Sequence, residues 1–148
     1  METYTAPTLA VLGEVAAKVL ASLKHTSKPG AVVLTLTGEL GAGKTAFVQQ
    51  LGLHLGVTET MVSPTFVVMK RYQTTDAVFA NLVHIDAYRL EDGAEVAPLH
   101  IEEIFNELNT LVCIEWASNM RDTLPEAPAS LEIIDTNGVR TLTYIPAL

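Results

Sequence analysis

Eight residues near the middle of the first half of the chain constrain its fold more than any other stretch. Residues 38–45 read GELGAGKT and fit the phosphate-binding pattern G-x-x-x-x-G-K-[ST] at every fixed position. The preceding residues 31–36, AVVLTL, are typical of a buried strand, and apolar residues recur at helical spacing in the following segment, 47–55. A strand, a glycine-rich loop and a helix in this order predict a P-loop that binds phosphate.

The motif assigns roles to its residues. Loop N–H groups and the positive end of the next helix form an anion site, Lys44 reaches the β- and γ-phosphates, and the Thr45 hydroxyl ligates Mg²⁺. The predicted nucleotide-binding residues are Gly38, Glu39, Leu40, Gly41, Ala42, Gly43, Lys44, Thr45 and Ala46. The alternative is a glycine-rich turn without a ligand. Because the chain contains no N-K-x-D segment to read guanine, ATP is the expected nucleotide.

Composition narrows the class of protein. A chain of 148 residues that is 49% hydrophobic is expected to form a single domain, residues 1–148, with a core that needs no disulfide. The net charge is -8, and the longest basic cluster is the pair Lys70 and Arg71. Because nucleic-acid binding depends on basic surface, any RNA contact is expected to need a partner protein.

Cysteine content and the distribution of apolar residues predict the cellular location. Cys113 is the only cysteine and lies in an apolar run, so a reduced thiol in the core is expected. No apolar stretch approaches the roughly 18 residues of a membrane span, and the N-terminus lacks the order of a secretion signal. A soluble, cytoplasmic protein without membrane contact is the expectation.

The remaining pattern predicts a mixed sheet. Thr8 is placed to cap a helix through residue 23, and strands at 65–72 and 78–88 are close enough in the chain to pair as an antiparallel hairpin. A third strand is expected at 111–116. Residues 101–108 show one apolar helical face, formed by Ile101, Ile104, Phe105 and Leu108.

A second hairpin is predicted near the C-terminus. Residues 131–134 and 141–145 flank Asn137 and Gly138, the strongest short signal for a type I′ turn. With the helices, these elements predict an α/β fold, a P-loop NTPase-like three-layer sandwich whose mixed sheet includes antiparallel hairpins.

Two carboxylates follow apolar runs and are candidates for chemistry. Glu115 is predicted to join Thr45 in holding Mg²⁺, the alternative being a solvent contact at a strand end. Asp86 is predicted to orient or deprotonate the attacking water, the alternative being a structural ion pair with Arg89. Both residues are expected at the carboxyl ends of neighbouring strands.

Five other side chains are candidates for the site. Thr65, in the segment VSPTF, is either the first residue of a strand or part of a loop that acts as a switch on the γ-phosphate. His84 shares a strand face with Asp86. Trp116 is either a core residue or an exposed anchor for a partner. Arg89 is the best internal candidate for an arginine that stabilises transition-state charge, followed by Arg121.

The motifs GELGAGKT, SPTF, HIDAYRL and IEW occur in the order and spacing of the TsaE family, which the chain resembles over nearly its whole length. The resemblance implies a cytoplasmic ATPase of bacterial tRNA threonylcarbamoyladenosine biosynthesis that binds the TsaB-TsaD heterodimer and meets tRNA only through that complex. It also implies phosphate and Mg²⁺ roles for Lys44, Thr45 and Glu115, a switch-like role for Thr65, and a role for Asp86 in hydrolysis. Trp116 matches the tryptophan of the family's EW pair.

Two alternatives to this ATPase remain open. A small-molecule kinase is one, although residues 91–109, where a lid would be sought, contain no arginine. A nucleotide-dependent switch, in which the bound state matters more than hydrolysis, is the other.

Overall fold

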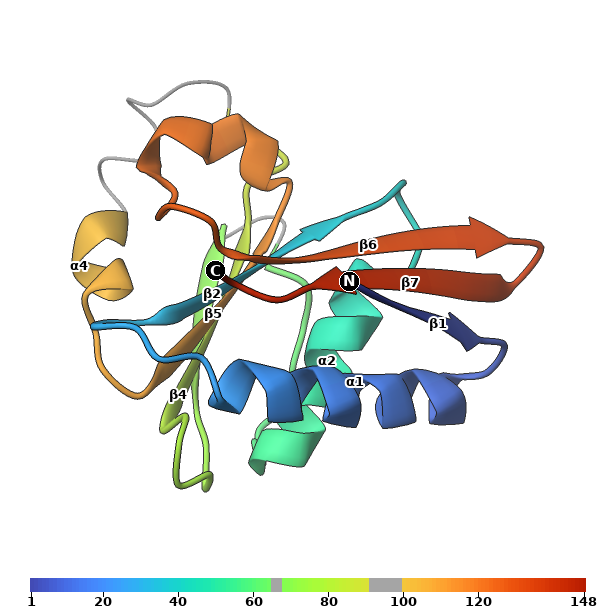
Figure 1. The fold of residues 1–148 in the computed structure, drawn as a ribbon, viewed down its shortest axis with the longest axis horizontal. Helices are drawn as coiled ribbons and strands as arrows, with labels where there is room; N and C mark the ends of the chain where they lie inside the picture. Colours follow the sequence, from blue (N-terminus) through green and yellow to red (C-terminus); the bar gives the residue numbers. More distant parts are fainter. Residues whose placement is uncertain (65–67, 91–99) are drawn as a thin grey trace.

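The computed structural model describes residues 1–64, 68–90 and 100–148, and these residues form a seven-stranded mixed sheet (Figure 1). The strand order is β1-β7-β6-β2-β5-β4-β3. The strands are β1 (Glu2–Ala6), β2 (Val32–Thr37), β3 (Met69–Gln73), β4 (Asn81–Asp86), β5 (Thr110–Glu115), β6 (Ala129–Thr136) and β7 (Val139–Ile145).

The central strands bring three chain segments to one edge. β2 is parallel to both of its neighbours, β5 and β6, and β4 is parallel to β5. Their side chains are mostly apolar because both faces of this part of the sheet are covered. Parallel strands end at the same edge, so the loop after β2 meets the last residues of β4 and β5. Asp86 and Glu115 are paired in register there.

Two long helices cover one face of the sheet (Figure 1). α1 (Leu9–Lys24) begins after Thr8, whose Oγ1 accepts a hydrogen bond from the N–H of Val11 at 3.2 Å. α2 (Lys44–Leu55) ends at Gly56, which has the left-handed φ of 81° that favours glycine at this position. The predicted cap at Thr8 is therefore confirmed.

Shorter helices lie over the opposite face. α4 (Ile101–Phe105) and the 3₁₀ helix η2 (Ala117–Thr123) enclose a second apolar cluster, while α1 and α2 enclose the first. The second cluster includes Ile104, Val112 and Met120. Two layers of helices around one sheet confirm the predicted three-layer α/β architecture.

Both predicted hairpins are present. β3 pairs antiparallel with β4, and β6 pairs antiparallel with β7. Asn137 and Gly138 have φ values of 53° and 87°, and two successive positive φ values are what a type I′ turn requires. This turn carries β7 back along the outer side of β6.

The structure departs from prediction at three strands. β1 was not predicted, because four of its five side chains are partly or fully exposed and leave no apolar alternation to detect. The strand predicted at 65–72 begins at Met69, since Val68 has a φ of 70°, and residues 65–67 lie outside the described residues. The strand predicted at 78–88 is confined to β4.

The predicted apolar face at 101–108 is only partly correct. Ile101 and Ile104 are buried, and Phe105 packs against the same cluster. Leu108, however, is 69% exposed. The helix α4 ends at Phe105, so Leu108 no longer follows the helical face from which its position was inferred.

The structure also describes the surroundings of the cysteine and the lengths of the helices. Cys113 is a free thiol, fully buried in β5, as expected. Within the described ranges, no helix has both the length and the apolar character needed to cross a membrane.

Candidate phosphate-binding site

The GELGAGKT motif forms the connection between β2 and α2. Gly43, the residue before α2, has a φ of 112°, which other residues rarely adopt. A Cβ atom built on Gly43 would stand 2.6 Å from Nε of Arg140, and one built on Gly38 would stand 2.5 Å from the carbonyl oxygen of Ile133. Glycine at these positions lets the loop pack tightly and leaves backbone at the start of α2, where helix N–H groups bind anions.

The Lys44 side chain is folded against its own loop. It is 5% exposed, and its Nζ donates to the carbonyl oxygens of Gly38 at 2.5 Å and Glu39 at 3.3 Å. The ammonium also lies 4.4 Å from the centre of the Trp116 ring. Burial lowers the pKa of Lys44, while the carboxylate of Glu115 acts in the opposite direction. A phosphate group would offer this ammonium a charged acceptor in place of two neutral carbonyl groups.

Glu115 ends β5 and is 3% exposed. Thr45 Oγ1 donates to its Oε2 at 3.0 Å and lies 3.3 Å from Oε1. His84 Nε2 lies 2.6 Å from the same Oε2 on the other side. Both partners therefore orient a carboxylate that would be costly to bury alone.

Asp86 ends the neighbouring strand β4 and is 5% exposed. Its Oδ1 accepts a hydrogen bond from the N–H of Tyr88 at 3.0 Å. The Tyr88 and Trp116 ring centres are 5.1 Å apart, with the planes tilted by 55°. The ends of β4 and β5 thus place the Asp86 carboxylate beside the aromatic rings of Tyr88 and Trp116.

These side chains line one pocket of about 420 Å³. The pocket is lined by the predicted residues Leu40, Gly41, Gly43, Lys44, Thr45, Ala46, Asp86, Glu115 and Trp116, together with Ser63, Tyr88 and Arg140. The pocket therefore brings together the Lys44 ammonium, the Thr45 hydroxyl and two carboxylates that lie far from the loop in the sequence.

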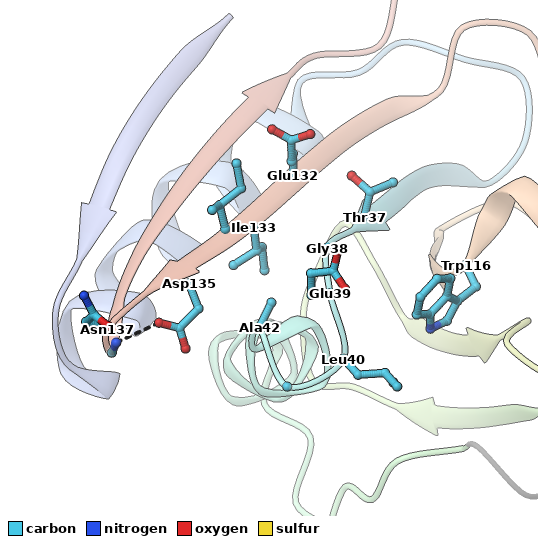
Figure 2. A pocket seen from close by; sticks show the side chains of 13 residues that line it. Thr37, Gly38, Glu39, Leu40, Ala42, Trp116, Glu132, Ile133, Asp135 and Asn137 are labelled. Carbon is cyan, nitrogen blue, oxygen red and sulfur yellow. Dashed lines mark hydrogen bonds between the residues drawn. The ribbon is translucent and has the colours of Figure 1, made fainter.

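A larger hollow of about 770 Å³ adjoins the loop (Figure 2) and shares Leu40, Gly41 and Trp116 with the smaller pocket. It is bounded by residues 37–42, by Trp116 and by the β6–β7 hairpin, where Asp135 accepts from the N–H of Gly138 at 2.8 Å. The charged side chains among its described lining residues are all acidic: Glu39, Glu132 and Asp135. The smaller pocket, which contains Lys44, is thus the better phosphate site.

The predicted loop residues Gly38, Glu39 and Ala42 line the larger hollow rather than the smaller pocket. Arg89 is exposed in the turn after β4 and is not among the described residues that line the pocket. Thr65 lies outside the described residues, although Ser63, two positions earlier, does line the pocket. The roles assigned to Arg89 and Thr65 stay predictions.

Sequence reasoning missed Arg140 altogether. It lies on β7, and its Nε donates to the carbonyl oxygen of Ala42 at 3.0 Å. The pattern around it, a polar and apolar alternation after a turn, carries no sign of a phosphate site. His84 was noticed only for its strand position, and its contact with Glu115 depends on the parallel pairing of β4 with β5.

The oxygen donors fit Mg²⁺ better than a metal held by protein alone. Among the described residues, no group of three or more His, Cys, Asp or Glu side chains is able to hold a metal ion. Mg²⁺ usually binds one or two protein oxygen ligands together with substrate phosphates and water. The hydroxyl of Thr45 against the carboxylate of Glu115 is a donor pair of that kind.

Comparison with protein families identifies one match. Residues 10–142 match the model of the family described as "Threonylcarbamoyl adenosine biosynthesis protein TsaE". Relatives named tRNA threonylcarbamoyladenosine biosynthesis protein TsaE include those of Bacillus subtilis, 42% identical over 68% of this chain, and Rickettsia felis, 35% identical over 81%. The matched regions span 59% and 68% of those two proteins.

Two further comparisons extend along the chain. The relative of the same name from Haemophilus influenzae is 31% identical over 90% of this chain and 80% of its own length. The crystal structure of Bacillus subtilis YdiB superposes with a TM-score of 0.73, covering 99% of this chain and 86% of that chain. At 24% identity, the second likeness is evidence of a shared fold.

Proposed function

Because this chain belongs to the TsaE family, we propose that it is the Mg²⁺-dependent ATPase subunit of bacterial tRNA threonylcarbamoyladenosine biosynthesis. In this proposal it binds the TsaB-TsaD heterodimer in the cytoplasm, and its ATP hydrolysis drives turnover of the threonylcarbamoyl transfer to tRNA. The observation that carries the ATPase assignment is the meeting of Lys44, Thr45, Asp86 and Glu115 in one pocket. The net charge of -8 favours contact with tRNA only through the partners.

Nucleotide binding is assigned to the loop and its lysine. The loop N–H groups and the N-terminus of α2 hold the phosphates, while Lys44 exchanges the carbonyl groups of Gly38 and Glu39 for phosphate oxygens. The interaction with a phosphate is stronger than either carbonyl contact because both partners are charged. Binding is thereby coupled to release of Lys44 from its own loop.

The carboxylates are assigned to the hydrolytic step. Thr45 and Glu115 would hold Mg²⁺, which when bound neutralises charge on the phosphates. Asp86 accepts a proton from, or orients, the water that attacks the γ-phosphate. Its hydrogen bond with the Tyr88 N–H uses Oδ1 and fixes the carboxylate at the pocket.

The direct test is ATP hydrolysis by the purified chain, alone and with TsaB and TsaD. Lys44→Ala is expected to lower hydrolysis by ~10²-fold or more, the scale on which a positioned charge stabilises a transition state. Lys70→Ala is the matched control, because Lys70 is an exposed lysine on β3 away from the pocket. Equal rates of ATP hydrolysis for wild type and Lys44→Ala would show that the phosphate loop takes no part in the reaction.

A second variant separates the ATPase from a nucleotide-dependent switch. Asp86→Ala is expected to bind ATP with an affinity similar to that of wild type while losing hydrolysis. Loss of threonylcarbamoyl transfer by the reconstituted complex would then show that hydrolysis is required. Preserved transfer with this variant would favour the switch, and phosphate appearing on an added small nucleophile would favour the kinase.

A further inference from the structure

An arginine from the far end of the chain lies against the phosphate loop. Arg140, on β7, donates from Nε to the carbonyl oxygen of Ala42 at 3.0 Å and is half-buried. A Cβ atom on Gly43 would stand 3.4 Å from its Cζ as well as 2.6 Å from its Nε. The guanidinium group therefore packs directly on the backbone of the residue that precedes α2.

The hydrogen bond from Arg140 to Ala42 uses one edge of the planar guanidinium group. Arginine carries five N–H donors in a fixed planar fork, and Nε supplies one of them. Arg140 lines the same pocket as Lys44 and Thr45, where phosphate is expected, and its Nε is the donor that contacts the loop. Among the described lining residues, Lys44 and Arg140 are the cationic side chains, against Asp86 and Glu115.

The strand order decides from which side Arg140 approaches. In the sheet, β7 and β6 lie on one side of β2, while β5 and β4 lie on the other. Asp86 and Glu115 come from β4 and β5, so the groups assigned to hydrolysis and Arg140 flank the loop from opposite sides. This placement suits a contact with phosphates that ATP and ADP share, rather than with the γ-phosphate during transfer.

We propose that Arg140 is a nucleotide-binding residue that donates from its terminal nitrogens to the α- or β-phosphate of a bound nucleotide while its Nε holds the loop at Ala42. The inference rests on the proposed ATP-binding function. It adds Arg140 to Lys44 as a second cationic side chain of the binding site. Arg140 would then act in the ground state, leaving any arginine that stabilises transition-state charge to be supplied from elsewhere.

The test compares ADP and ATP affinities, measured by calorimetry with Mg²⁺, for wild type, Arg140→Gln and Arg140→Lys. Arg140→Gln is expected to weaken ADP and ATP binding equally, by ~10- to 100-fold, the scale for hydrogen bonds to a charged group. Arg140→Lys keeps the charge but loses the fork, so a smaller loss is expected. Arg71→Gln is the control, since Arg71 pairs with Glu107 at 2.6 Å outside the pocket.

Two further measurements separate a contact with phosphate from anchoring of the loop. They are the affinity for inorganic tripolyphosphate and the midpoint of thermal unfolding without ligand. A phosphate contact predicts that Arg140→Gln weakens tripolyphosphate binding too and that Arg140→Lys restores much of it. Equal losses in both variants, together with an equal fall in the midpoint of the ligand-free protein, would assign Arg140 to loop anchoring and overturn the proposal. Unchanged ADP affinity in Arg140→Gln would also overturn it.

The two proposals fail differently. A wild-type protein that binds neither ATP nor ADP contradicts the proposed function, and the inference falls with it. A wild-type protein that binds both, alongside an Arg140→Gln variant that binds them equally well, contradicts only the role of Arg140.

Discussion

Nε2 of His84 lies 2.6 Å from Oε2 of Glu115, and both side chains are almost completely buried. The two residues occupy adjacent parallel strands, β4 and β5, where His84 stands opposite Cys113 in register. Glu115 therefore receives support from the sheet interior through His84 and from the phosphate loop through Thr45. Together with Thr45, His84 therefore orients the carboxylate for which we propose a role in Mg²⁺ binding.

Removing the histidine should loosen that carboxylate. His84→Ala is expected to raise the Mg²⁺ concentration for half-maximal ATP hydrolysis by ~10- to 100-fold, as loss of a partner behind a metal ligand usually does. Stabilisation of the ADP-bound protein by Mg²⁺, measured as a thermal shift, should fall in parallel. His25→Ala, at an exposed position, is the control. An unchanged Mg²⁺ requirement would contradict the positioning role.

Trp116 should report nucleotide binding. It is the only tryptophan in the chain, and the Lys44 ammonium lies 4.4 Å from its ring centre. If a phosphate draws Lys44 away from Gly38 and Glu39, the charge beside the indole moves and its fluorescence changes. Titration with ADP should give a saturable change, and adenosine, which has no phosphate, should give none. The same response in Lys44→Ala would contradict this explanation.

Asp76 should contribute stability that depends on pH. Burial favours its protonated form, but the hydrogen bonds from Lys24 and from the N–H groups of Phe79 and Val78 outweigh this and lower the pKa of Asp76. Because the folded-state pKa lies below the unfolded one, the stabilisation is complete above the unfolded pKa and is lost as the pH falls through the folded value.

Asp76→Asn is the corresponding variant. It is expected to lower the free energy of unfolding by about 1 to 3 kcal/mol at pH 7, the scale for a hydrogen bond to a charged group. Urea denaturation near pH 7 and in acid should show this difference shrinking as the wild-type carboxylate is protonated. Glu59→Gln, at an exposed carboxylate, should have little effect at either pH. A difference that is independent of pH would contradict the linkage.

Cys113 should be unreactive in the folded protein. It is fully buried in β5, and this burial raises the pKa of its thiol well above the usual range. Reaction with a thiol reagent should therefore be slow without denaturant and rapid in urea, where the chain is unfolded. Cys113→Ser is expected to cost roughly 1 to 3 kcal/mol of stability, since it buries a hydroxyl in an apolar layer. Rapid labelling of the native protein would contradict this burial.

Local features of this protein were predictable because their physical causes lie close together in the chain. The loop at 38–45 was predictable from its glycines and from the strand and helix around it. Thr8 caps α1 by accepting a hydrogen bond from the N–H of a residue three positions later. Asn137 and Gly138 form a turn because both adopt positive φ values. The apolar runs ending at Asp86 and Glu115 predicted two strand ends in the same way.

Tertiary structure decided which distant residues contact the loop and the carboxylate beside it. Arg140 reaches Ala42 because β7 folds back along β6, and His84 meets Glu115 because β4 and β5 pair in one register. Neither contact leaves a periodic signal in the sequence, since each depends on pairing between segments far apart in the chain. The sequence by itself determined the phosphate loop and the strand ends beside it, and only the tertiary structure determined the neighbours that hold them.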